Sequence, residues 1–448
     1  MELAVLIGGK VAGSLDLSEK QPSFEYAPAY IQGGGPPLSI GIPLSRARAE
    51  GEGLRRWLEG LLPDDTDTIR GLRREHGLQG GDYLRVLGTS MGVDCAGAIQ
   101  FCPPERIEYL LSATGDEEPI TEGEIAEWLE RIRTNPGNRA FRAGRADSGF
   151  SLDGAQPKVA VRRSPGGGWI VPDGPRPTTH IIKLARQDRF ANEAVTEHLV
   201  METVRHMGVT VARTRPARFE GVEVLVVDRY DRSSDGTFRI HQEDLCQALG
   251  YRPDMKYESD GGPVPEEIAH ELRRADPANA EANMRQFRNA LLCQWLVASI
   301  DSHAKNHSVM LLGQGTMRLA PIYDLNSWLP YRKDTPVSML RMAMGIGSDV
   351  TIGSADQPEA MRLTAERLGL SPLETAERAV ELATQLPWAL DEAIEALPPP
   401  MADLPVVGVL RDGLSARIPK CREVAESAAS QARPRAGRGG STVASIGP

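Results

Sequence analysis

The sequence is poor in cysteine, and the few cysteines that it has are not arranged in pairs. Its five cysteines, Cys95, Cys102, Cys246, Cys293 and Cys421, are scattered over 448 residues, and no Cys-x-x-Cys pair occurs among them. A disulfide framework or a redox motif would show regular or closely spaced cysteines. Unpaired thiols are typical of proteins kept in a reducing compartment. We therefore expect a cytoplasmic protein.

The chain also lacks any hydrophobic run long enough to cross a membrane. Roughly 18 consecutive apolar residues would be needed for a spanning helix, and no such stretch is present. The first residues, MELAVLIGGKVAGSL, have no basic region ahead of their short apolar stretch, unlike a secretory signal. We expect a first β-strand there and no membrane partner.

An excess of positive charge is missing as well. The chain carries 51 Lys and Arg against 61 Asp and Glu, a formal net charge of -10. This balance argues against broad nucleic-acid binding by the chain alone, because such binding depends on neutralising phosphates with Lys and Arg. The hydrophobic fraction of 41% and the length of 448 residues are typical of a globular protein with two or three domains or lobes.

The most informative stretch is a polar loop between an apolar helix and a hairpin. Apolar residues at helical spacing predict a buried helix that ends at Ile300. The next seven residues, DSHAKNH at 301–307, are almost all polar. Val309–Leu312 and Met317–Ile322 then predict two strands joined by a glycine turn. Such a hairpin would bring Asp324 back beside the loop.

This order of acidic and amide side chains matches the needs of phosphoryl transfer. The acceptor hydroxyl needs a carboxylate to orient and deprotonate it, and Mg²⁺ on the phosphates needs hard oxygen ligands. Protein kinases provide an Asp, an Asn five residues later and a second Asp after a short hairpin, which is the spacing of Asp301, Asn306 and Asp324. A polar loop of capping side chains is the plain alternative. A metal site on His303 and His307 is another, but no third Cys or His lies near in the sequence.

Predicted secondary structure and composition divide the chain into four parts. Residues 1–105 read as a β-rich module, 106–240 as a lobe built around a sheet, 241–426 as a helical lobe that holds the polar loop, and 427–448 as a disordered tail rich in Arg, Gly, Ser and Ala. Within this division, Pro103–Leu111 is predicted to be a strand. The fold class expected is α+β, with two lobes and an extra N-terminal module.

The lobe built around a sheet is predicted to contain three strands, then one helix, then two more strands. Predicted strands lie at 159–161, 169–171 and 180–184, a helix at 190–207, and two more strands at 212–219 and 222–227. Lys183 stands alone in an apolar strand, where burial is costly unless it meets an anion such as a phosphate. Glu193, early in the helix, is its candidate partner. An edge strand with Lys183 facing water is the alternative.

Two further segments fit a nucleotide site. Residues 151–158, SLDGAQPK, precede a strand, and their small residues let backbone N–H groups approach phosphates. This is neither a Walker loop nor Gly-x-Gly-x-x-Gly, and a generic β-turn is the plain reading. Asp228–Tyr230 end the last strand, where a kinase hinge would bind adenine, although a surface strand end with paired charges is equally compatible with them.

Taken together, these pieces resemble the HipA family of serine/threonine kinase toxins. The matching stretches are SLDGAQPKVAV, THIIKLARQ followed by ANEA, VVDRYDR, HQEDLCQALG, KYESDGGP, DSHAKNHSVML and LAPIYDLNS. In the N-terminal module GIPLSRAR, LLPDD and DCAGAIQ resemble the segment that precedes the kinase core in that family. The resemblance covers roughly residues 1–420, and its motifs are specific as a set. It implies a bilobed protein-kinase-like fold with a β-rich N-lobe and a helix-dominated C-lobe.

The resemblance also implies a role for each site residue. It implies Asp301 as catalytic base, Asn306 and Asp324 as Mg²⁺ ligands and Ser151 as the site of inhibitory autophosphorylation. The implied ATP-binding residues are Asp153, Gly154, Ala155, Gln156, Pro157 and Lys158 in a phosphate loop, Lys183 on the α- and β-phosphates, Asp228, Arg229 and Tyr230 in a hinge, and His303, Ala304, Lys305, Asn306, Tyr323 and Asp324 around the nucleotide.

The same resemblance implies partners. These are a protein substrate, often an aminoacyl-tRNA synthetase, whose phosphorylation arrests growth, and a HipB-like helix-turn-helix antitoxin that binds operator DNA. Two departures from the family pattern are Ser299, where Asn is usual, and Asp228, where Glu is common. Neither removes a required group, so we expect an active kinase. A co-repressor that uses nucleotide only to hold its shape, and a small-molecule kinase, are the competing hypotheses.

Overall fold

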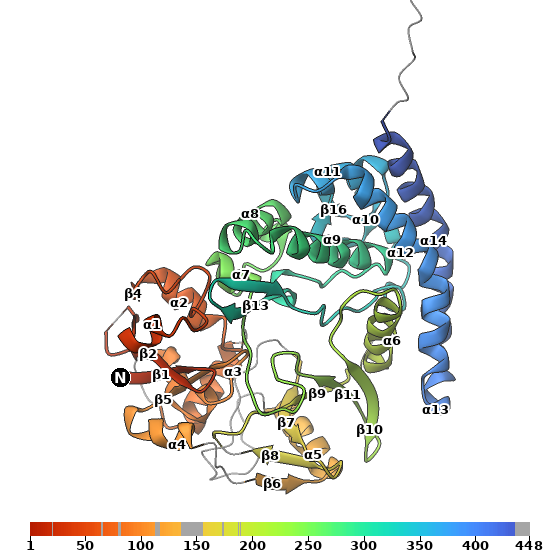
Figure 1. Ribbon diagram of the computed structural model, residues 1–448. Coiled ribbons are helices and arrows are strands. Elements are labelled where there is room, and N and C mark those ends of the chain that lie inside the picture. The colour runs from red at the N-terminus through yellow and green to blue at the C-terminus, as the bar shows by residue number, and fades with distance from the viewer. Residues whose placement is uncertain are drawn as a thin grey trace, which may run out of the picture.

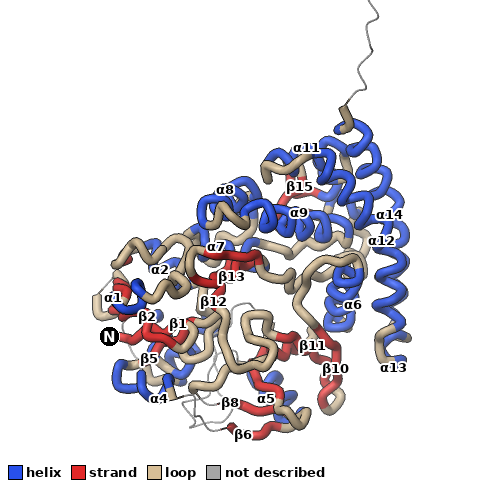
Figure 2. The backbone as a smooth tube through the Cα atoms, viewed as in Figure 1, coloured by secondary structure: helices blue, strands red, loops and turns tan. Residues whose placement is uncertain are grey.

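The structure is a computed structural model of the 448-residue chain. It describes residues 1–19, 21–63, 66–78, 82–112, 117–135, 156–172, 174–186, 188 and 190–434. Three parts follow one another along the chain (Figure 1): an N-terminal module, a lobe built on a sheet and a helical lobe that ends in two long helices. Figure 2 shows the helices gathered mainly in the last of these.

The N-terminal module is organised around a five-stranded antiparallel sheet with the order β4-β3-β2-β1-β5. Its strands are β1 (Glu2–Ile7), β2 (Lys10–Asp16), β3 (Ser23–Tyr26), β4 (Arg48–Glu50) and β5 (Ile99–Cys102). Gly8 and Gly9 join β1 to β2 with φ values of 59° and 74°, a backbone that glycine adopts without steric cost. The strand predicted at the N-terminus is therefore present, as an internal strand buried on both faces.

Short helices complete the module. They are α1 (Pro28–Gln32), α2 (Glu52–Glu59), α3 (Thr66–Glu75) and α4 (Ile107–Leu111), with 3-10 turns η1 (Tyr83–Gly88), η2 (Ser90–Gly92) and η3 (Pro104–Arg106). The strand predicted over Pro103–Leu111 is wrong, because η3 and α4 occupy it. Pro104 lies at the first position of η3, where its missing N–H costs nothing.

The second lobe contains a six-stranded sheet with the order β10-β11-β9-β7-β8-β6. Its elements are β6 (Glu117–Ile120), α5 (Glu122–Thr134), β7 (Lys158–Arg163), β8 (Trp169–Pro172), β9 (His180–Leu184), α6 (Glu193–His206), β10 (Thr214–Phe219) and β11 (Val222–Asp228). Helix α5 shares a core with the strands, whereas α6 contributes most of its buried residues to the core of the helical lobe. In this register Lys158 of β7 lies opposite Lys183 of β9.

The third part is mainly helical and encloses a small sheet ordered β12-β13-β14 and a hairpin of β15 and β16. Its helices are α7 (Leu245–Leu249), α8 (Pro265–Ala275), α9 (Ala280–Leu296), α10 (Ile352–Ala355), α11 (Pro358–Arg367), α12 (Pro372–Glu395), α13 (Pro399–Ala402) and α14 (Pro405–Ala432). The strands and 3-10 turns are β12 (His241–Asp244), η4 (Glu258–Asp260), η5 (Ala304–Asn306), β13 (Ser308–Gly313), β14 (Thr316–Leu319), η6 (Val337–Met339), β15 (Arg341–Ile346) and β16 (Asp349–Thr351).

Two predicted boundaries differ from the structure in this lobe. Helix α9 ends at Leu296 rather than at Ile300, and Ala298 then adopts a left-handed φ of 53°, which turns the chain into the polar loop. Helix α14 continues to Ala432, so residues 427–432 are helical and not disordered. Ala428 and Ala429 are buried there, and small side chains allow such close helix packing. None of the helices in the described part of the chain is long and apolar enough to cross a membrane.

A buried ionic cluster connects the N-terminal module to the segment after β11. Arg229 Nη2 lies 2.8 Å from Asp231 Oδ2, and Arg232 Nη2 lies 3.0 Å from Asp94 Oδ1 in the module. The backbone N–H of Gly97 donates to Asp231 Oδ2 at 2.7 Å. These charged side chains are buried. Removing one partner would leave an uncompensated buried charge, so the cluster fixes how the module meets the lobe.

A second junction joins the module to β12. Glu243 accepts hydrogen bonds from the Ile40 backbone N–H and from Trp57 Nε1, both at 2.8 Å. The next residue, Asp244, accepts a hydrogen bond from Lys305 Nζ at 2.8 Å. Because Lys305 belongs to the polar loop, the module contacts the strand that anchors this loop.

Candidate functional site

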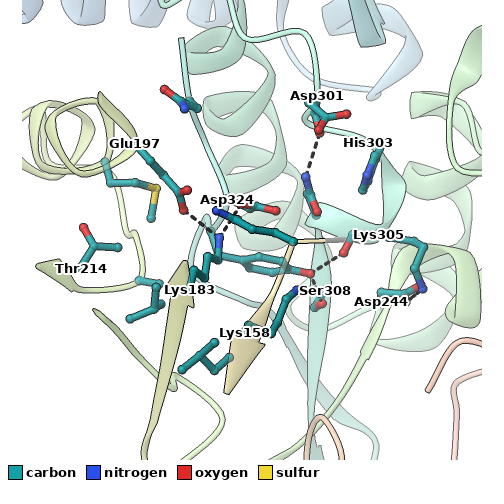
Figure 3. A pocket seen from close by; sticks show the side chains of 18 of the residues that line it. Lys158, Lys183, Glu197, Thr214, Asp244, Asp301, His303, Lys305, Ser308 and Asp324 are labelled. Atoms are coloured by element: carbon teal, nitrogen blue, oxygen red, sulfur yellow. Dashed lines mark hydrogen bonds and ion pairs between the residues drawn. The ribbon is translucent and has the colours of Figure 1, made fainter. Parts of the chain in front are cut away.

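A cavity of about 450 Å³ opens between the sheet lobe and the helical lobe. Residues from β7, β9, α6 and the end of β11 line one side of it, and residues from the 301–307 loop and from the turn after β14 line the other. Figure 3 shows the labelled side chains that project into it, among them Lys183, Asp301 and Asp324. The volume is within the usual range for small-ligand pockets.

The structure places most of the predicted site residues around this one cavity. Those that line it are Gln156, Lys158, Lys183, Asp228, Arg229, Tyr230, Asp301, His303, Lys305, Asn306, Tyr323 and Asp324. Pro157 and Ala304 are not among the lining residues, although both belong to segments that border it. Ser151, Asp153, Gly154 and Ala155 lie outside the described residues, so their predicted roles stay predictions.

Asp301 begins the polar loop, and Asn306 closes it. Asn306 Nδ2 donates to the backbone carbonyl of Asp301 at 2.8 Å, which ties the two ends of the loop together, and Asn306 lines the cavity. The hydroxyl of Tyr257 donates to Asp301 Oδ1 at 2.6 Å. The loop is thus held by its own side chains and by a tyrosine from a distant segment.

The surroundings of Asp301 alter its proton affinity in opposing ways. Its side chain is exposed toward the cavity opening, but the surrounding protein reduces its hydration and raises its pKa above the ordinary value. The hydrogen bond from Tyr257 opposes this increase, and the negative charge of Asp324 adds to it. A carboxylate with a raised pKa is a stronger acceptor for a hydroxyl proton, as a general base requires.

Lys183 is held between two carboxylates. Its Nζ lies 2.6 Å from Asp324 Oδ1 and 2.9 Å from Glu197 Oε1. Burial alone would lower the pKa of Lys183, but the two negative charges outweigh it and raise that pKa. Burial would likewise raise the pKa of Asp324, but the Lys183 charge dominates and depresses it. Burial raises the pKa of Glu197 despite its contact with Lys183.

The structure corrects the predicted partner of Lys183. Glu193 had been the candidate, but it lies at the first position of α6 and pairs with Arg186 at 3.5 Å. Glu197 lies four residues later, on the same helix face and one turn deeper. Only 4% of Glu197 is exposed, so the helix presents its carboxylate to β9 beneath the cavity.

Asp324 has an unusual backbone. Its φ is +56°, which a non-glycine residue adopts only where the surroundings compensate for the strain. The contact with Lys183 supplies such compensation. Strained residues of this kind cluster at functional sites, and here the conformation turns the Asp324 carboxylate toward the cavity (Figure 3).

The segment that leads into β7 also reaches the cavity. Lys158, the first residue of β7, lines it and lowers the pKa of Asp324 through its charge. Gln156 Nε2 donates to the Leu184 carbonyl at 2.8 Å, and the Pro157 carbonyl accepts from the Leu184 N–H at 2.9 Å. These bonds fix the end of the predicted phosphate loop against β9.

The three predicted hinge residues differ in burial: Asp228 is exposed, Arg229 is buried and Tyr230 is intermediate. Asp228 pairs with His180 at 3.3 Å, and the Arg229 guanidinium lies in the buried ionic cluster described above. Tyr230 stacks on Tyr323 with ring centroids 5.5 Å apart. Tyr230 and Tyr323 therefore present ring surface to the cavity, whereas the charge of Arg229 is committed to holding the N-terminal module.

The rest of the polar loop has mixed roles. Lys305 borders the cavity, but its Nζ is bonded to Asp244 (Figure 3). The alternative zinc-type site on His303 and His307 gains no support. The His307 ring packs on Phe287, and no group of three or more His, Cys, Asp or Glu able to hold a metal occurs in the described ranges.

Among the lining residues that the sequence reasoning missed, three lie close to Lys183 or Asp301: Glu197, Lys256 and Tyr257. Glu197 had a signal, since it follows Glu193 by one helical turn on the same face. Lys256 and Tyr257 belong to the KYESDGGP stretch that carried part of the resemblance, but no periodicity or spacing linked it to Asp301. Only the folded chain brings this stretch beside the polar loop.

The two lobes, the cavity between them and the lysine and acids within it define a protein-kinase-like fold. The chain matches the family model of the HipA-like C-terminal domain over residues 150–390 and that of the HipA N-terminal domain over residues 3–102. Because the first match spans more than half of the chain, this protein belongs to the HipA family, and the resemblance read from its motifs is confirmed.

Individual relatives agree with this assignment. The chain is 32% identical over 339 residues to the Y4mE protein of Sinorhizobium fredii, covering 74% of this chain and 77% of that protein. It is 26% identical over 419 residues to the serine/threonine-protein kinase toxin HipA of Shewanella oneidensis, covering 89% and 90%.

A solved complex of HipA, HipB and operator DNA from Shewanella oneidensis contains a similar chain. The TM-score is 0.78 at 23% identity, and the match covers 96% of this chain and 99% of that chain. At this identity the similarity establishes the fold. The predicted α+β, bilobed kinase-like architecture is confirmed.

Proposed function

We propose that this protein transfers the γ-phosphoryl group of ATP to a serine or threonine hydroxyl of a protein, with Mg²⁺. The observation that carries the proposal is the convergence of Lys183, Asp301, Asn306 and Asp324 on one cavity between two lobes. Phosphoryl transfer depends mainly on positioning and charge stabilisation, and these four residues are the types and the order that it requires.

The donor set of the cavity fits ATP with Mg²⁺. When bound, Mg²⁺ neutralises charge that develops on the phosphates. It takes oxygen ligands, commonly one or two carboxylates together with phosphate oxygens and water, and Asn306 and Asp324 offer an amide oxygen and a carboxylate. Lys158 and Lys183 lie opposite one another at the same end of the cavity. Their positive charges would hold the phosphates.

Within this proposal each residue has a separate task. Asp301 accepts the proton of the acceptor hydroxyl, and Asn306 both closes the loop and holds metal. Lys183 positions the α- and β-phosphates, while Glu197 holds Lys183 in place from below. The stacked rings of Tyr230 and Tyr323 form an apolar wall on which the adenine would pack.

The names of relatives guide the choice of acceptor and partner. One relative is named a serine/threonine-protein kinase toxin, and the solved Shewanella complex joins HipA with HipB and operator DNA. We extend both to this chain: a protein acceptor, of which an aminoacyl-tRNA synthetase is the class we favour, and a HipB-like helix-turn-helix antitoxin as neutralising partner. The net charge of -10 favours DNA contact through that partner rather than through this chain.

Metal-dependent transfer to protein is the test. Purified protein is incubated with ATP labelled on the γ-phosphate and with myelin basic protein, in Mg²⁺ or in excess EDTA, and labelled residues are identified after acid hydrolysis. The proposal predicts labelled phosphoserine or phosphothreonine in Mg²⁺ and none in EDTA. Label that is absent in Mg²⁺, or equal in both conditions, would overturn it. Myelin basic protein stands in for the cellular acceptor, and label on the protein itself counts equally.

A further inference from the structure

The segment from Lys256 to Gly262 has no task in the proposed function, although it has a well-defined structure beside the cavity. Gly261 has a φ of 84°, and a Cβ on Gly262 would lie 2.3 Å from the Met255 carbonyl oxygen. The Gly262 N–H donates to the Tyr257 carbonyl at 2.9 Å. The two glycines therefore close a tight turn around Tyr257 that larger residues would open.

The turn is fixed to the helical lobe and to the polar loop. Glu258 Oε2 accepts from the Gly345 N–H at 2.5 Å, and Glu258 Oε1 accepts from Arg367 Nη2 at 2.8 Å. On the other side, the Lys256 carbonyl accepts from the Ala304 N–H at 3.1 Å. The segment thus joins the body of the lobe to the loop that carries Asp301.

Tyr257 is the point where the segment meets Asp301. Its hydroxyl donates to Asp301 Oδ1 at 2.6 Å, and its ring meets His303 edge-on with centroids 5.2 Å apart. Among the described residues, Tyr257 is the one side chain that hydrogen-bonds this carboxylate. The ring is held from both ends, so the hydroxyl has a defined position.

We propose that Tyr257 is a positioning residue for Asp301, holding one carboxylate oxygen so that the other accepts the proton of the acceptor hydroxyl. This inference rests on the proposed function. A carboxylate on a loop can rotate about two side-chain bonds, and a general base must lie within hydrogen-bond reach of the proton it removes. Misplacement by about 1 Å can cost 10²-fold in rate. The fixed phenol removes this freedom without occupying Oδ2.

The test removes only the hydroxyl. In Tyr257→Phe the ring stays against His303, while Asp301 loses its donor. We expect the maximal rate of transfer to fall by about tenfold or more, as for loss of a hydrogen bond to a charged group, with the KM for ATP unchanged because Tyr257 is assigned no phosphate contact. The probes are ATP labelled on the γ-phosphate and myelin basic protein.

Tyr251→Phe is the matched control. Tyr251 lies in the same connection between α7 and α8, and its hydroxyl donates to Glu267 Oε2 at 2.8 Å, away from Asp301. The Tyr251→Phe variant loses the same hydroxyl oxygen from the same stretch of chain as Tyr257→Phe does. Its transfer rate should equal that of the wild type. Equal losses in the two variants would mean that any hydroxyl in this stretch supports the rate, which contradicts a specific role for Tyr257.

A double variant separates positioning from general support of the fold. If Tyr257 acts through Asp301, then Tyr257→Phe should cause no further loss in an Asp301→Asn background, since interacting groups are not additive. A purely structural role would reduce the rate again by the same factor. An active wild type with an equally active Tyr257→Phe would overturn this inference alone. A wild type without transfer would overturn the proposed function, and this inference with it.

Discussion

Lys183 Nζ donates a hydrogen bond of 2.6 Å to Asp324 Oδ1, although the two residues are 141 positions apart in the chain. One lies in β9 of the sheet lobe and the other in the turn after β14 of the helical lobe. This contact therefore spans the cavity and links both lobes at the place where phosphates and metal would bind. The geometry of the site therefore depends on how the two lobes are placed relative to each other.

Replacing Lys183 with Ala should weaken ATP binding and phosphoryl transfer together. The lysine would contact phosphates both before and during transfer, so its loss affects the ground state and the transition state. We expect at least tenfold weaker ATP affinity, the effect of losing about 1.4 kcal/mol. ATP titration by calorimetry and the labelled-phosphate assay measure the two effects. Lys10→Ala, on an exposed position of β2, should change neither. Unaltered affinity and rate in Lys183→Ala would remove this lysine from the site.

The ion pair between Lys183 and Glu197 should stabilise the folded protein. Glu197→Ala leaves Lys183 with one carboxylate partner in a buried place, and should lower the free energy of unfolding by about 2 to 3 kcal/mol. Glu193→Ala is the matched control one helical turn away and should cost less than about 1 kcal/mol, because its partner Arg186 is partly exposed. Urea unfolding followed by fluorescence gives both values. If the order of the two losses were reversed, Glu193 would be the true partner.

The sequence alone was sufficient to predict the site residues that lie near one another along the chain. Asp301, Asn306 and Asp324 lie within one helix–loop–hairpin unit, and local pattern fixes their spacing. Tyr257 meets Asp301 through a contact across 44 residues, and no local pattern encodes such a distance. The choice of Glu197 over Glu193 depends on where α6 begins, since a helix start that is displaced by one turn changes which residue faces β9.

The buried histidines predict acid sensitivity. His241 Nε2 donates to the backbone carbonyl of Leu38 in the N-terminal module at 3.0 Å, and burial lowers the pKa of His241 from 6.5 to about 4. The unfolded chain therefore binds a proton below about pH 6.5 that the folded chain does not bind until about pH 4. Stability should be complete above pH 6.5 and decrease as the pH falls toward 4.

The contribution of His241 can be measured directly. In His241→Gln this residue no longer titrates, so the loss of melting temperature between pH 7 and pH 5 should be smaller than in the wild type. His270→Gln, on the exposed face of α8, should retain the wild-type loss. An identical pH dependence in all three proteins would show that His241 does not couple folding to protonation.

Ser151 is proposed to be an inhibitory autophosphorylation site. A phosphate would add roughly -1.5 to -2 charges close in sequence to the predicted phosphate loop, and repulsion from ATP should lower nucleotide affinity. After incubation with ATP and Mg²⁺, mass spectrometry should find phosphoserine at 151, and affinity for ATP should fall. Ser151→Ala should keep its affinity through the same incubation. An unmodified Ser151, or a modified one with intact ATP affinity, would contradict this role.

We propose that Asp301 accepts the proton of the acceptor hydroxyl during phosphoryl transfer from ATP. The test is single-turnover transfer of labelled phosphate, measured in the wild type and in Asp301→Asn together with the Kd for ATP. In Asp301→Asn we expect transfer to fall by about 10²-fold or more, the scale of a lost general base, while the Kd for ATP stays within about twofold. Transfer at the wild-type rate by Asp301→Asn would contradict this role of Asp301.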